Sequence, residues 1–173
     1  MGRKEAHLEG RQAEPIVVLG VDPGTRRAGI AALSEGGKLR FRRAVSLNGT
    51  DPNRRLLGLY EVVAAALDRS GAAILAIENP SHPRNARTAH LLGRAVGVCV
   101  LAAVERDLIV LEYRPAQVRR VVEIVRRRWP SSARWSEDEL VAAAAALLGL
   151  MEPIEHAGGL QHLPETAGKK ARP

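Results

Sequence analysis

Short apolar runs alternate with longer amphipathic segments along the chain, which is typical of a domain built from both strands and helices. Three predicted strands follow one another with only turns between them, which favours an antiparallel meander. The later strands are separated by helices, which favours parallel additions to the same sheet. The predicted fold is therefore α/β, a mixed five-stranded sheet flanked by helices. Strands are predicted at 16–21, 28–34, 39–47, 73–77 and 108–112, and helices at 53–69, 85–106, about 115–128 and about 136–151.

Both ends of the chain depart from this pattern. Residues 1–14 are polar and are predicted to be a disordered N-terminal extension. Residues 153–173 are polar and rich in Gly and Pro, and are predicted to be a weakly ordered tail. The remaining residues, 15–152, are enough for one compact domain.

Composition narrows the class of protein. The chain has 26 Lys and Arg against 19 Asp and Glu, a net charge of +7 that favours a nucleic-acid partner, although other basic proteins share it. A single cysteine, Cys99, excludes an internal disulfide and a zinc cluster held by several thiolates. The first residues lack the apolar stretch of a secretion signal, and no apolar run suggests a membrane span. We therefore expect a cytoplasmic protein without a membrane partner.

Two acidic residues directly follow continuous apolar runs. Asp22 ends the run 16–21, and Glu78 ends the run 73–77. Strands of this kind are buried on both faces, and their ends open at the rim of an α/β sheet, where ligands bind. Carboxylates that lie close together need a cation to stay ionised, and Mg²⁺ prefers such oxygen ligands. The alternative for Asp22 is structural, because Asp-Pro-Gly is a favoured turn sequence.

The residues around both acids resemble the RuvC-type Holliday junction resolvases. Five blocks occur in the family's order between residues 16 and 122. The blocks are VLGVDPGTRRAGI at 18–30, LAIENP at 75–80, RNARTA at 84–89, LGRAVG at 92–97 and LEYRPAQVR at 111–119.

This resemblance implies an RNase H-like fold, a homodimer and symmetric nicking of four-way DNA junctions, with a branch-migration helicase as a further candidate partner. It implies that Asp22 and Glu78 are the first two catalytic metal ligands. The implied cofactor is a pair of Mg²⁺ ions, with Mn²⁺ as a candidate substitute. In such two-metal hydrolysis the cations lie about 3.5–4 Å apart and stabilise the attacking and leaving oxygens.

The family completes its site with two more ligands, spaced three apart near the start of a final helix, and in some members the first is histidine. If 136–151 is that helix, Asp138 or a neighbouring glutamate supplies the acid. If 136–151 is the helix before it, the pair falls at His156 and Gly159. Chain distance after Tyr113 favours the second placement, although Gly159 cannot bind a metal. We therefore keep both Asp138 and His156 as candidate ligands.

Basic and polar residues near these blocks are candidate contacts for DNA phosphates. If both acids mark the rim of the sheet, residues on the adjoining loops and helix surround it, and binding should weaken with salt. The alternative is that a part of them covers solvated helix faces. The candidate DNA-binding residues are Arg26, Arg84, Asn85, Arg119 and Arg120.

Three functions are compatible with these sequence features. The first is a Mg²⁺-dependent endonuclease that resolves four-way junctions. The second is a nuclease-impaired junction-binding protein, motivated by the missing final acid. The third is an RNA-processing nuclease of the related YqgF type, against which the block around Tyr113 argues.

Overall fold

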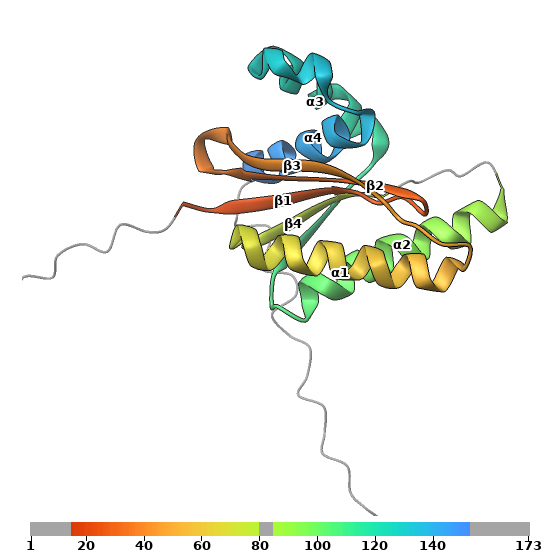
Figure 1. Cartoon of the computed structure of the whole chain (residues 1–173). Helices are drawn as coiled ribbons and strands as arrows, with labels where there is room; N and C mark the ends of the chain where they lie inside the picture. Colours follow the sequence, from red (N-terminus) through yellow and green to blue (C-terminus); the bar gives the residue numbers. More distant parts are fainter. Residues whose placement is uncertain (1–14, 80–84, 153–173) are drawn as a thin grey trace, which may run out of the picture.

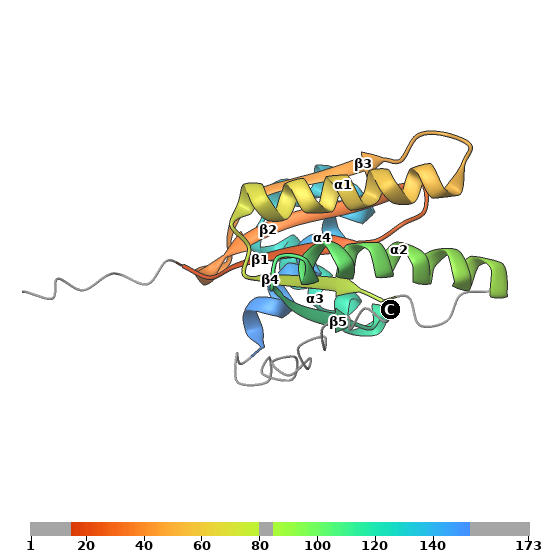
Figure 2. The ribbon, with the colours of Figure 1, turned by 90° about the horizontal axis from the view of Figure 1, so that it is seen from below.

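In the computed structural model, which describes residues 15–79 and 85–152, five strands form one mixed sheet in the order β3-β2-β1-β4-β5 (Figures 1 and 2; β5 is labelled in Figure 2). Strand β2 pairs antiparallel with β1 and β3, whereas β4 is parallel to β1 and β5 is parallel to β4. The predicted α/β fold with three antiparallel strands and two parallel additions is confirmed. The strands are β1 (Val17–Asp22), β2 (Arg27–Ser34), β3 (Lys38–Ser46), β4 (Ile74–Glu78) and β5 (Ile109–Tyr113).

Two helices cover each face of the sheet. Figures 1 and 2 show α1 (Pro52–Ser70) and α2 (Ala86–Val104) on one face and α3 (Pro115–Arg128) and α4 (Glu137–Met151) on the other. Short 3-10 turns at Glu35–Gly37 and Pro130–Arg134 complete the described elements. The extension and tail predicted at the chain ends lie outside the described residues.

The sheet separates two apolar cores. Side chains alternate across a strand, so Leu19 and Val21 of β1 face α1 and α2, whereas Val18 faces α3 and α4. All three are inaccessible to solvent. Because β1 lies at the centre of the sheet and is buried on both faces, the position of its last residue, Asp22, is determined by packing on both sides.

Helix α4 lies unusually close to the sheet. A Cβ atom on Gly20 of β1 would lie 1.9 Å from the carbonyl oxygen of Ala142, and one on Gly149 would lie 2.8 Å from a Val18 methyl group. Residues 142–146 of α4 are all buried alanines, and two of them, Ala142 and Ala146, lie against Gly20, where their small side chains allow this approach. Glycine in the strand and alanine in the helix therefore bring the start of α4 down onto the strand ends.

One helix differs from the sequence expectation. By length and composition α2 could cross a membrane, the one such helix among residues 15–79 and 85–152, whereas the sequence suggested none. Its buried residues, among them Ala95, Cys99 and Ala102, belong to the core formed with α1 and the sheet. Core helices of globular proteins can meet the same test, so one such helix is weak evidence for a membrane span.

We expect Gly20→Ala to lower the free energy of unfolding by at least about 3 kcal/mol, because its new methyl group would meet the backbone of α4. Gly58→Ala is the matched control. A Cβ at Gly58, inside α1, meets nothing within 4 Å, so this change should stabilise the protein by about 0.5–1 kcal/mol. Urea denaturation measures both values. Equal effects of the two substitutions would contradict the close packing of α4.

Candidate functional site

Asp22 and Glu78 lie next to each other at one edge of the sheet. Each is the last residue of its strand, β1 and β4 respectively, and the preceding residues, Val21 and Ile77, are direct partners in the parallel register. Both side chains are only partly exposed. The sequence prediction that these two acids end neighbouring central strands is confirmed.

The N-terminus of α4 adds a third carboxylate. Asp22 pairs with Gly29 across the β1–β2 register, and a Cβ on Gly29 would lie 1.9 Å from the carbonyl oxygen of Asp138. The first turn of α4 therefore lies directly on the strand pair that carries Asp22. Glu137 precedes Asp138 in the same turn.

Several contacts hold this turn in place. Ser136 caps α4 by accepting a hydrogen bond from the backbone N–H of Glu139, whose carboxylate in turn accepts one from the Ser136 backbone N–H at 2.8 Å. Arg42 of β3 donates to the same carboxylate, and its guanidinium lies 4.5 Å from the centre of the Trp135 ring. The start of α4 is thus attached to the edge strand as well as to the centre of the sheet.

Burial and neighbouring carboxylates raise the pKa values of both strand acids, Asp22 and Glu78. Burial raises the pKa of Asp22 to about 7, and the charges of Glu78, Asp138 and Glu137 add to this effect. Burial also raises the pKa of Glu78, with a contribution from Glu137, while the guanidinium of Arg119 opposes the rise. The four carboxylates are therefore close enough to interact electrostatically: Asp138 acts on Asp22, and Glu137 acts on both strand acids.

This donor set fits a hard divalent cation, because it offers carboxylate oxygens that repel one another. It is not a finished coordination shell. Within the described part of the chain, no three Asp, Glu, His or Cys side chains are gathered at metal-binding spacing. One reason is that Asp138 points to Arg27, whose Nη2 lies 2.8 Å from Oδ2 of Asp138.

The companion ligand expected three residues from Asp138 does not appear as an acid. Position 135 is tryptophan and position 141 is valine, and both side chains are buried. Glu137, the neighbouring glutamate, is exposed and lies close enough to shift both strand acids. The alternative ligand, His156, lies outside the described residues.

The residues predicted to contact DNA lie in different parts of the structure. Arg119 of α3 acts on Glu78 and so lies near the acids, while Arg26 and Arg120 are exposed on the β1–β2 turn and on α3. The side-chain oxygen of Asn85 accepts a hydrogen bond from the N–H of Thr88 and caps α2. The remaining candidate, at position 84, lies outside the described residues.

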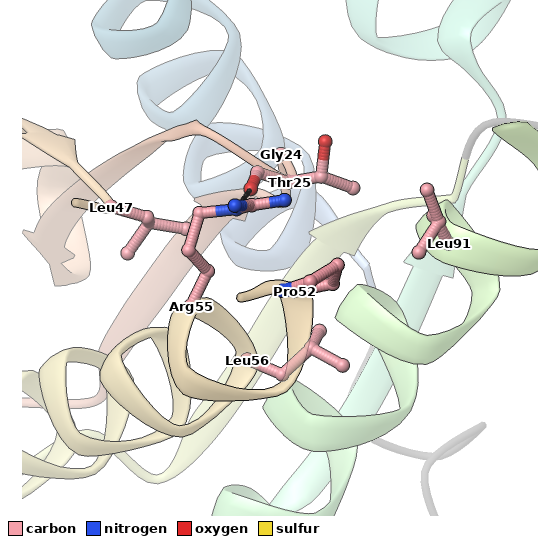
Figure 3. Close-up of a pocket in the computed structure, with 7 residues that line it drawn as sticks. All are labelled: Gly24, Thr25, Leu47, Pro52, Arg55, Leu56 and Leu91. Atoms are coloured by element: carbon pink, nitrogen blue, oxygen red, sulfur yellow. Dashed lines mark hydrogen bonds between the residues drawn. The ribbon is translucent and has the colours of Figure 1, made fainter. Parts of the chain in front are cut away.

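Sequence reasoning missed a buried arginine behind the turn that follows Asp22. Arg55 of α1 is only 7% exposed, and it donates to the carbonyl oxygens of Thr25 at 2.9 Å, Gly49 at 2.7 Å and Thr50 at 3.0 Å. Figure 3 shows its guanidinium beside Gly24 and Thr25 at a small pocket. The pattern of an amphipathic helix does not indicate that one of its arginines is buried. Here the hydrogen bonds of Arg55 hold the turn between β1 and β2 against α1.

Comparisons with known proteins agree with this geometry. A RuvC protein of Corynebacterium glutamicum is 30% identical over 145 residues, which cover 81% of this chain and 62% of that protein. One from Anaeromyxobacter is 30% identical over 170 residues, which cover 91% of this chain and 78% of that protein. In structure, the T. thermophilus RuvC solved in complex with Holliday junction substrate has a TM-score of 0.68 at 23% identity, covering 83% of this chain and 96% of that one, which supports the fold.

The family model described as crossover junction endodeoxyribonuclease RuvC matches residues 18–126, a range that contains Asp22 and Glu78 but ends before α4. The resemblance inferred from the five sequence blocks is thereby confirmed, and the chain belongs to the RuvC family of crossover junction endodeoxyribonucleases.

Proposed function

We propose that this chain is a metal-dependent endonuclease that cuts four-way DNA junctions, with Asp22, Glu78 and Asp138 as ligands of the metal. Membership of the RuvC family supports the reaction and the substrate. The observation that carries the ligand assignment is that acids from β1, β4 and the start of α4 converge at one edge of the sheet.

A divalent cation would supply charge for the developing oxyanions of phosphodiester hydrolysis and lower the pKa of a bound water. The chain's own residues position the substrate and the acids. Arg119, beside Glu78, and Arg26, on the turn after Asp22, are suited to hold phosphates near the acids, because guanidinium pairs well with phosphate oxygens. Arg84, Asn85 and Arg120 are the further DNA contacts suggested by the sequence, of which Arg120 is exposed on α3 and Asn85 caps α2.

For the third ligand we favour Asp138 over His156. The close contact between the backbone of Asp138 and Gly29 supports the view that α4 is the helix that completes the site. Glu137 is then the candidate for a further carboxylate, since its charge acts on both strand acids. Two Mg²⁺ ions, with Mn²⁺ able to replace them, are the cofactors that this carboxylate set would take.

The remaining partners follow from the family. We infer that the protein acts as a homodimer in the cytoplasm, together with a branch-migration helicase. The exposed side of α2 is the surface that suits a second copy, because it combines two exposed glycines with two exposed apolar side chains, and exposed apolar patches mark contact surfaces. These residues are Gly93, Gly97, Leu101 and Val104.

A nuclease-impaired junction-binding protein is the second candidate function. It is favoured by the two apolar residues, Trp135 and Val141, at the positions three residues from Asp138, where the family has a second ligand. An RNA-processing nuclease of the YqgF type is less well supported, because the matching family model is that of RuvC.

The direct test is incubation of a synthetic four-way junction with the protein and Mg²⁺. We expect paired symmetric nicks, and a loss of at least about 100-fold in Asp22→Asn with unchanged junction binding in EDTA. Asp68→Asn, which removes an exposed acid of α1 far from these strand ends, is the matched control and should cut normally. Normal binding without cleavage in Mg²⁺ or Mn²⁺ would select the binding protein, and preferential cleavage of structured RNA would select the YqgF-type nuclease.

The third ligand is tested by a pair of variants. Asp138→Asn should reduce the nicking rate about 10- to 100-fold, because loss of a carboxylate weakens metal binding. His156→Ala should retain most of the activity. Single-turnover cleavage at several Mg²⁺ concentrations measures both. The reverse result, an inactive His156 variant beside an active Asp138 variant, would contradict the assignment.

The burial of Asp22, together with its acidic neighbours, predicts a pH dependence of stability. The folded protein binds the Asp22 proton more tightly than the unfolded chain, so metal-free stability should fall as pH rises from about 4 to about 7 and then level off. Asp22→Asn should therefore raise the free energy of unfolding at pH 8 by about 2–4 kcal/mol without metal. Mg²⁺ should stabilise only the unsubstituted protein. Urea titrations with EDTA or Mg²⁺ check this, and an Asn variant that is less stable at pH 8 without metal would refute it.

A further inference from the structure

Arg27 holds an unusual position beside the acids. It is the first residue of β2, five residues after Asp22, and it pairs with Ser46 of β3 in the sheet. Its side chain is 59% exposed, yet Nη2 lies 2.8 Å from Oδ2 of Asp138, whose side chain is 27% exposed. A cationic group thus already contacts the carboxylate that we assign to the metal.

We propose that Arg27 is a positioning residue that holds the Asp138 carboxylate until a divalent cation displaces it, and thereby sets the metal concentration at which the site fills. The inference rests on the proposed function, because it takes Asp138 as a metal ligand. The guanidinium of Arg27 and the metal compete for Oδ2 of Asp138, because both cannot lie close to this atom at the same time.

The contact between Arg27 and Asp138 is close but lacks the geometry of a hydrogen bond, which would allow a metal to displace the guanidinium. Oδ2 of Asp138 is buried, and it accepts no properly oriented hydrogen bond from any residue within 15–79 and 85–152, although Nη2 of Arg27 is close. The attraction is therefore one of charge without good hydrogen-bond geometry. A buried carboxylate oxygen left in this state favours a partner that binds it directly.

The surrounding charges define what Arg27 does. Asp22 and Asp138 repel each other, and Arg27 offsets this repulsion from the β2 side. Removing Arg27 would make the electrostatic potential at the acids more negative and would leave Oδ2 of Asp138 without a nearby cation. The affinity for a divalent cation should then rise, and it should rise through Asp138.

Arg26 provides a matched control. It lies next to Arg27 in the chain, is exposed and carries the same charge, but among the described residues it forms no ion pair. Arg26→Gln and Arg27→Gln therefore change the net charge equally. Only Arg27→Gln removes the contact with Asp138.

The experiment measures thermal unfolding of the full chain while Mg²⁺, and separately Mn²⁺, is titrated, which gives the metal affinity from the shift in Tm without any cleavage assay. Both glutamine variants, Asp138→Asn and the double variant Arg27→Gln with Asp138→Asn are compared with the unsubstituted protein. Metal affinity should rise about two- to fivefold in Arg27→Gln, as expected for a partly exposed ion pair, and by clearly less in Arg26→Gln. In the Asp138→Asn background the two- to fivefold gain from the Arg27 substitution should disappear, leaving no more than the small gain seen in Arg26→Gln.

Each possible outcome of this experiment either supports or overturns the proposal. An equal gain in the two glutamine variants would show a general charge effect and overturn the proposal, as would a gain that persists without Asp138. An unchanged or weaker affinity in Arg27→Gln would overturn it as well. If metal stabilises the Asp22→Asn variant as much as the unsubstituted protein, the proposed function itself fails, which separates that failure from a failure of the role of Arg27.

Discussion

The close contact between α4 and the central strands is the constraint on which the candidate site depends. Glycine at positions 20 and 29 removes the side chains that would otherwise keep the helix backbone at a distance. The start of α4 then lies over the end of β1, where the charge of Asp138 acts on Asp22. A helix at ordinary distance from the sheet would leave the strand acids as an isolated pair.

Such a cluster of like charges needs compensation, and the fold supplies it from several directions. The N-terminus of α4 carries the positive end of the helix dipole, which favours anions. Arg119 acts on Glu78 from α3, and Arg27 contacts Asp138 from β2. The compensation remains partial, because the neighbouring carboxylates still add to the rise that burial causes in the pKa of Asp22, to about 7. A site that is charged but incompletely neutralised is suited to take up a divalent cation.

Much of this arrangement could be predicted from the sequence, and the reasons are local. Continuous apolar runs that end in Asp22 and Glu78 indicate central strands, and parallel neighbours bring their ends together. The role of α4 could not be predicted in the same way, because after its acidic first turn the helix is apolar on all sides and the pattern does not show which side faces the sheet. Chain distance favoured His156, whereas the contact with the sheet, visible only in three dimensions, favours Asp138. The burial of Arg55 and the contact of Arg27 with Asp138 likewise depend on segments far apart in the chain.

The most direct test of the account is the anomalous diffraction of a crystal of this protein soaked with Mn²⁺. We predict an ion between β1, β4 and α4, with carboxylate oxygens of Asp22, Glu78 and Asp138 at about 2.1 Å and Arg27 turned away. An ion held by His156 while Asp138 stays on Arg27, or no ion at these strand ends, would contradict it.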